Sequence, residues 1–203
     1  MPTSVRPSRD QLDREIVDRA AALFARHGFA QTSLQAVADA SGYSKAGLLH
    51  HFPSKQALHD AALALSRAQA QAVLDLVAHL PVGPERDRRA IGALADAALS
   101  SPGLTALNLG TVSTLAYGSP ADHGEHDGTV LFATFGVDPA NGDPDRLVRV
   151  ISALAALSVV AVVAHQVVSE PTAWRRSIVA ASFDALGHRR PSAPTSALDQ
   201  VEA

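Results

Sequence analysis

The chain has 203 residues, of which 47% are hydrophobic and 4% aromatic, and its formal net charge is −3 at pH 7. This length suits one large or two small domains, and the slightly acidic balance alone gives no indication of nucleic-acid binding. The absence of cysteine excludes a disulfide framework, a thiolate metal site and a cysteine nucleophile, and it fits a cytoplasmic protein. The N-terminus lacks the apolar core of a secretory signal.

Residues 9–27 are predicted to form the first helix. Ser8 and Gln11 have the spacing of a capping box, and Gly28 would end the helix. One helical stripe is apolar and consists of Leu12, Ile16, Ala20, Leu23 and Phe24. Residues 1–8 are expected to be a flexible arm.

Residues 33–55 indicate two short helices joined by a glycine turn, with a third helix following. Ser33, Ser44 and Ser54 stand at N-cap positions, and Gly42 can adopt the positive φ that a sharp reversal needs. Two helices joined by such a turn are typical of a helix-turn-helix, whose second helix enters the major groove of DNA. The alternative is a pair of ordinary capped helices in a bundle.

The run TSLQAVADASGYSKAGLLHHFPSKQAL, residues 32–58, resembles the DNA-binding segment of TetR-type transcriptional regulators. The resemblance covers about residues 10–65. It departs at Leu49, where the family usually has tyrosine, and at Tyr43, where it often has valine. The resemblance implies an all-α homodimer with a three-helix helix-turn-helix domain and a C-terminal helical bundle that binds an effector and dimerises.

On this interpretation the DNA contacts fall in two groups. The first group, expected to contact base edges in the groove, is Tyr43, Lys45, Ala46 and His50. The second group, expected to contact phosphates, is Thr32, Ser33, Ser44, His51 and Lys55. The partner would be a double-stranded, near-palindromic operator.

Beyond this segment, further helices are predicted at about 54–79, 85–100, 104–117, 144–168 and 171–186, with a short helix at 129–136. The domain boundaries expected are 9–55 for DNA binding and 56–187 for the body, and 188–203 is expected to be a disordered tail. Residues 148–168 are long and apolar enough to raise the question of a membrane span. Their five alanines, two serines and polar residues favour a buried central helix instead, so no membrane partner is expected.

The body is predicted to hold two kinds of surface. A mostly apolar effector pocket for a small molecule could be lined by Asn108, Thr111, Tyr117, Phe132, Phe135 and His165. The last two helices, by resemblance, would form the seam of a homodimer through Leu154, Leu157, Ser158, Ala161, Val162, Ile178, Ala181 and Ser182. The alternative for these helix faces is closure of the monomer core.

No enzymatic constellation is present in the sequence. Residues 42–47 miss the G-x-S-x-G pattern by one position, and no phosphate-binding loop or HExxH motif occurs. His123 and His126 lie in an acidic loop that is better explained as solvated than as a metal site. No cofactor, metal or catalytic residue is expected. The alternative to a repressor released from DNA by a small molecule is a soluble ligand-binding or enzyme-like helical bundle that does not bind DNA.

Overall fold

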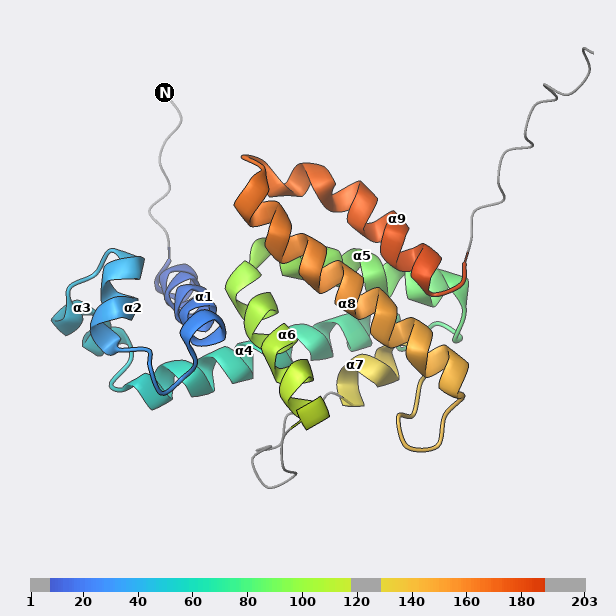
Figure 1. Ribbon diagram of the computed structural model, residues 1–203, viewed down its shortest axis with the longest axis horizontal. Coiled ribbons are helices and arrows are strands. Elements are labelled where there is room, and N and C mark those ends of the chain that lie inside the picture. The colour runs from blue at the N-terminus through green and yellow to red at the C-terminus, as the bar shows by residue number, and fades with distance from the viewer. Residues whose placement is uncertain (1–7, 118–128, 189–203) are drawn as a thin grey trace, which may run out of the picture.

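A computed structural model of the protein describes residues 8–117 and 129–188, with the side chains of 110–117 excepted (Figure 1). The arm before Ser8, the loop with His123 and His126, and the tail from residue 189 lie outside the described residues. The described part consists of helices and contains no strand, so the all-α prediction is confirmed.

The first three helices, α1 (Arg9–His27), α2 (Leu34–Ser41) and α3 (Lys45–His51), form what we call the head. Their predicted boundaries are confirmed because each has its predicted cap. Ser8 and Gln11 form the capping box, and Gly42 has a φ of 75° between α2 and α3. The apolar stripe of α1 packs with the inner faces of α2 and α3 and with the start of α4 in one cluster, formed by Ile16, Ala20, Phe24, Val37, Ala38, Leu48 and Leu58.

Helix α4 (Lys55–Val77) begins at the predicted cap Ser54 and runs from the head into the rest of the molecule (Figure 1). Helices α5 (Pro84–Ser100) and α6 (Pro102–Tyr117) follow it, and the chain turns by 109° between them. Helix α7 (Thr129–Thr134) confirms that the apolar stretch near 130 is a short helix and not a strand.

The chain closes with α8 (Pro144–Val167), the 3₁₀ helix η2 (Pro171–Trp174) and α9 (Arg175–Ala185). The predicted helix over 171–186 is therefore divided, because its first turn is 3₁₀. We call α4–α9 the body, and its core is one cluster that includes Ile91, Phe135, Val150, Leu157 and Ile178.

A buried charge cluster joins the far end of the body. The carboxylate of Asp87 is fully buried, accepts from Arg146 Nη2 at 2.7 and 2.8 Å, and lies 2.7 Å from His188 Nε2. These residues come from α5, α8 and the end of α9, so the cluster fixes the three helices together.

The head and the body meet mainly where α1 packs against α6, while α8 and α9 lie on the side of the body away from the α2–α3 unit (Figure 1). The head is therefore attached to the body through α4 in the sequence and through α1 in space.

Candidate DNA-binding surface

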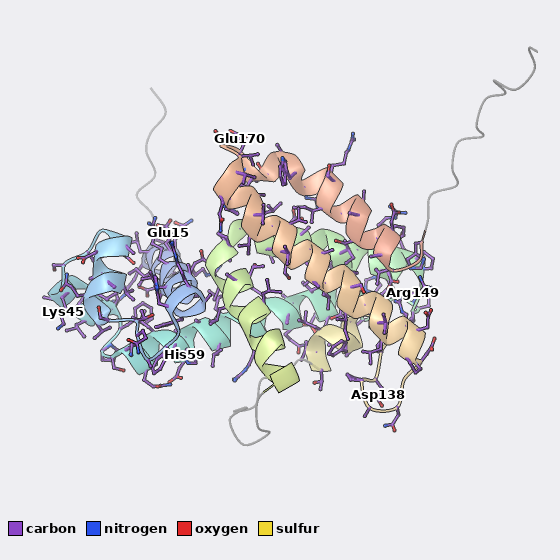
Figure 2. All side chains as sticks on the ribbon, viewed as in Figure 1. Glu15, Lys45, His59, Asp138, Arg149 and Glu170 are labelled. Atoms are coloured by element: carbon purple, nitrogen blue, oxygen red, sulfur yellow. The ribbon has the colours of Figure 1, made fainter. Side chains whose placement is uncertain are left out.

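Helix α3 presents a continuous exposed face. Leu48 is fully buried in the head, Ala46 and His50 lie on the opposite side of the helix, and Lys45 and Leu49 lie between, all four of them exposed. Lys45 lies at the tip of the molecule remote from the body (Figure 2). A helix of seven residues does not form alone in water, so its packing through Leu48 is what presents this face.

The serine hydroxyls that cap α2 and α3 can still donate a hydrogen bond to a ligand. Ser33 Oγ accepts the amide of Ala36 at 3.1 Å, and Ser44 Oγ accepts the amide of Gly47 at 3.0 Å. A hydroxyl that accepts at a cap retains its own proton, and both serines are exposed. Each can therefore donate to a phosphate oxygen at the N-terminus of its helix.

Thr32 does not fit the phosphate role predicted for it. Its side chain is only 4% exposed, and its hydroxyl lies 2.8 Å from the carbonyl oxygen of Gly28 and 3.3 Å from that of Leu23. The hydroxyl proton is used in a hydrogen bond at the end of α1, so the predicted phosphate contact of Thr32 is wrong.

His51 is also engaged within the head. Its Nδ1 lies 2.5 Å from a carboxylate oxygen of Asp13 on α1, and its side chain is 13% exposed. The ring of Tyr43 packs edge-on against it, with 5.3 Å between centroids. His51 therefore supports Tyr43 from behind, in place of the expected phosphate contact.

Lys55 points back to the loop after α1. Its ammonium donates to the carbonyls of Phe29 at 2.7 Å and Ala30 at 3.2 Å, and it lies 4.4 Å from the ring centroid of Phe29. Two of the three donors of this ammonium therefore hold the loop after α1 in the structure, and the phosphate contact stays a prediction.

The sequence did not predict two residues that contribute to this surface or support it. Leu49 is 38% exposed in the middle of the α3 face, where the sequence shows only a departure from the family pattern. Arg19 of α1 donates to the carbonyl oxygen of Ala40 at 2.9 Å and so holds the end of α2. No sequence spacing marks this contact, because the two residues are 21 positions apart.

The head also matches a known family in its sequence. Residues 16–62 match the family profile described as bacterial regulatory proteins, tetR family, and this range contains most of α1 and all of α2 and α3. The chain therefore carries the DNA-binding domain of the TetR family. It is a DNA-binding transcriptional regulator.

Solved structures described as regulators of this family share the fold over about nine tenths of the chain. A TetR-like transcriptional regulator from Rhodococcus sp. RHA1 has a TM-score of 0.54 and 18% identity, over 91% of this chain and all of its own. Mycobacterium smegmatis AmtR has a TM-score of 0.54 and 19% identity, over 94% of this chain and 92% of its own. A gamma-butyrolactone receptor described as ArpA-like has a TM-score of 0.52 and 18% identity, over 89% and 99%. At these identities the likeness establishes the fold alone, and no curated protein sequence matches the chain.

The effector residues predicted for this chain whose side chains are described do not converge on one cavity. Phe135 is fully buried in the body core and Phe132 packs against it, whereas Asn108 is exposed on α6. His165 lies near the C-terminal end of α8, and its Nε2 atom is 2.8 Å from the carbonyl oxygen of Leu99. The side chains of Thr111 and Tyr117 lie outside the described residues. The four described residues are therefore not one pocket lining.

Half of the residues predicted for the dimer seam are inside the monomer. Leu157, Ala161, Ile178 and Ser182 are buried against the protein's own core, so for these four the prediction is wrong. Leu154, Ser158 and Val162 are partly buried, and Ala181 is exposed.

A different stripe of α8 is exposed, which we call the α8 outer face. Its members recur every three or four positions, and they are Val148, Ile151, Ala155, Val159, Val163 and Val167. Beside it, a hollow of about 350 Å³ lies between α8 and α9 and is lined by Ala156, Val160, Trp174, Ser177, Ile178, Ala181 and Ser182. Helix α8 is also long and apolar enough to cross a membrane by composition, and 28% of its most apolar window is buried inside the chain. The sequence favoured a buried central helix over a membrane span.

Proposed function

We propose that this TetR-family protein is a repressor that binds a near-palindromic operator as a homodimer and is released by a small molecule. The exposed face of α3 carries the proposal, because it places a cation, small residues and an apolar side chain together on a helix that is held from behind by the head core. This is the arrangement in which a recognition helix enters a major groove.

We assign the DNA contacts within residues 9–55 by what each side chain still offers. Lys45 and His50 can reach base edges or phosphates, Ala46 leaves room for close approach, and Leu49 can contact the methyl group of thymine. Ser33 and Ser44 can donate to phosphates, and Tyr43 would contact DNA from the start of α3. Thr32, His51 and Lys55 are reassigned to supporting the head.

The α8 outer face supports the homodimer within the proposed body, residues 56–187. Five large apolar side chains in one stripe form an exposed patch of a kind that soluble monomers rarely retain. A second copy related by a two-fold axis would cover this stripe with its own. This also accounts for the strong apolar character of α8 in a protein that we place in the cytoplasm.

A small-molecule effector is proposed by similarity, since one of the structural neighbours is a gamma-butyrolactone receptor. The effector would have to bind the conformation that fits the operator less well, because a ligand with equal affinity for both conformations shifts nothing. The competing function, a helical bundle that binds a ligand or catalyses a reaction without DNA, has no observation in its favour.

The test is selection of random duplex DNA by the purified full-length protein, followed by titration of the selected sequence at two salt concentrations. Enrichment of a palindrome, bound by a dimer with an affinity that falls as salt rises, would support the proposal. Enrichment of a single half-site bound by monomers would overturn the homodimer. Failure to enrich any sequence, in the presence or absence of cell extract as a source of effector, would overturn the repressor.

A further inference from the structure

The junction between α5 and α6 receives polar side chains from three other helices. His165 of α8 lies 2.8 Å from the carbonyl oxygen of Leu99, at the end of α5. Gln69 of α4 donates to Ser101 Oγ at 3.3 Å, which explains the polar residue in the middle of an otherwise apolar stripe. Asp18 of α1 accepts the amide of Leu104 at 2.9 Å, in the first turn of α6. Contacts from the head, the connecting helix and α8 therefore meet at one bend of 109°.

Asp18 brings the head into this junction at very close range. Its carboxylate also receives the amide of Gly103, so it caps two of the amides at the start of α6. A Cβ atom at position 103 would lie 1.9 Å from the carbonyl oxygen of Asp18 and 3.0 Å from the amide nitrogen of Ala22. The two helix backbones are in direct contact here, and a contact between backbones has no side-chain rotation with which to absorb a change of tilt.

The carboxylate is also placed where charge is costly. Burial raises the pKa of Asp18 above its ordinary value, although the amides of Leu104 and Gly103, together with His165 and Arg19, act in the opposite direction. A buried charge is weak evidence for net stability, because its desolvation cost offsets what its hydrogen bonds return. The hydrogen bond to Leu104 and the close backbone contact define the position of α1 on α6.

We propose that Asp18 is a positioning residue that sets the angle of the head on the body, and through it the distance between the two α3 helices of the dimer. The inference rests on the proposed function, since only a dimer on a two-part operator has such a distance. A shift of α6 in the body would reach the head through this carboxylate, while the surface of α3 that contacts each half-site stays unchanged.

The experiment measures spacing preference. Operators are built from the half-sites selected by the wild-type protein, with the central spacer shortened or lengthened by one and two base pairs. Wild type, Asp18→Ala, Asp18→Asn and the control Glu15→Ala are titrated against each. Glu15 is an exposed carboxylate on the same helix, so the control removes the same charge from α1 (Figure 2).

The expected result is a loss of discrimination between spacers. Asp18→Ala should bind the optimal operator about tenfold more weakly, within the usual range of coupling between sites, and should bind the altered spacers about as well as wild type does. Asp18→Asn keeps an oxygen that can accept the amide of Leu104, and it should restore most of the preference. Glu15→Ala should keep the wild-type preference.

Two outcomes would overturn the inference while leaving the repressor intact. One is an Asp18→Ala protein whose affinity falls by the same factor on every spacer, as a general loss of stability would cause. The other is an unchanged preference in Asp18→Ala. If wild type selects no palindrome at all, the proposed function fails first, and this inference fails with it.

Discussion

At the scale of single residues, the chain's two lysines have different surroundings. Lys45 is exposed on the outer face of α3, whereas the Lys55 ammonium is held by two carbonyls and the ring of Phe29. Both sit at the first position of a helix, so their local sequence does not distinguish them. The difference comes from where the loop after α1 passes.

Lys45→Ala is therefore expected to weaken binding on every DNA sequence and to reduce the slope of log affinity against log salt by about one unit. Lys55→Ala is expected to leave the slope unchanged and to lower the free energy of unfolding by about 1 kcal/mol, the usual size of a lost hydrogen bond. The measurements are salt titrations of operator binding and urea denaturation of both variants. A reduced slope in Lys55→Ala would return that residue to the phosphate contacts.

Asp18 gives a prediction about pH. Because burial raises its pKa in the folded protein, the folded state favours the protonated carboxyl relative to the unfolded chain. This contribution to stability is fully present below the unfolded pKa, near 3.8, and is lost as pH rises through the higher folded value. Asp18→Asn cannot ionise, so its free energy of unfolding relative to wild type should increase as pH rises through that window.

Urea denaturation of both proteins at a series of pH values checks this. Taking the difference between them cancels the titration of all other groups that the substitution does not touch. A difference that stays constant with pH would show that the carboxyl has the same pKa in the folded and unfolded chains.

At the scale of elements, the contact of α1 with α6 depends on one missing side chain. Gly103→Ala would place a Cβ atom against backbone atoms of Asp18 and Ala22, which have no rotamer by which to move away. The helices would have to separate, and the expected cost is about 2 kcal/mol of unfolding free energy, as for overpacked cores. Operator affinity should fall with it.

Gly92→Ala is the matched control for this substitution. Gly92 lies inside α5, and a Cβ atom there would meet only Arg175 Nη2 at 3.8 Å, an ordinary contact. Alanine in a helix interior is preferred to glycine by about 1 kcal/mol, so this variant should be more stable than wild type. Equal destabilisation of the two variants in thermal and urea unfolding would refute the close-contact explanation.

The parts of this fold that were predictable are those decided by neighbours in the sequence. Ser8, Ser33, Ser44 and Ser54 cap helices through amides three residues away, and Gly42 supplies a turn that needs positive φ. Local rules are sufficient for such features. The surroundings of Thr32 were not predictable to the same extent, since its burial depends on how the head closes over the end of α1.

Long-range contacts explain the remaining differences. Asp13 meets His51 across 38 positions and Asp18 meets Leu104 across 86, and no periodic pattern marks either pair. The assignment of the faces of helix α8 was wrong for another reason. It is apolar on nearly all sides, so its periodicity could not show which stripe faces the core, and Leu157 was assigned to the wrong side.

At the scale of the whole molecule, the proposed homodimer and its two-part operator rest on the α8 outer face. Val159 and Val163 lie in the middle of this stripe, one turn apart, and are 44% and 39% exposed in the single chain. In a symmetric dimer each would meet the same helix of the second copy near the two-fold axis, so one substitution would act twice in the interface.

Val163→Glu should therefore be well tolerated by the monomer and poorly by the dimer. In the monomer the carboxylate lies in water, whereas in the dimer two carboxylates would be buried close together without a partner cation. The dissociation constant of the dimer should rise at least about a hundredfold, as measured by sedimentation of the protein at several concentrations. Leu76→Glu is the control, because it places the same charge on an exposed leucine of α4 outside the stripe. Circular dichroism should show both variants folded.

Because the two heads would then bind independently, Val163→Glu should also lose affinity for the full operator while keeping the half-site sequence preference of wild type. A Val163→Glu protein that remains dimeric would place the dimer contact on another face, and the spacing between the two α3 helices would have to be derived from that face instead.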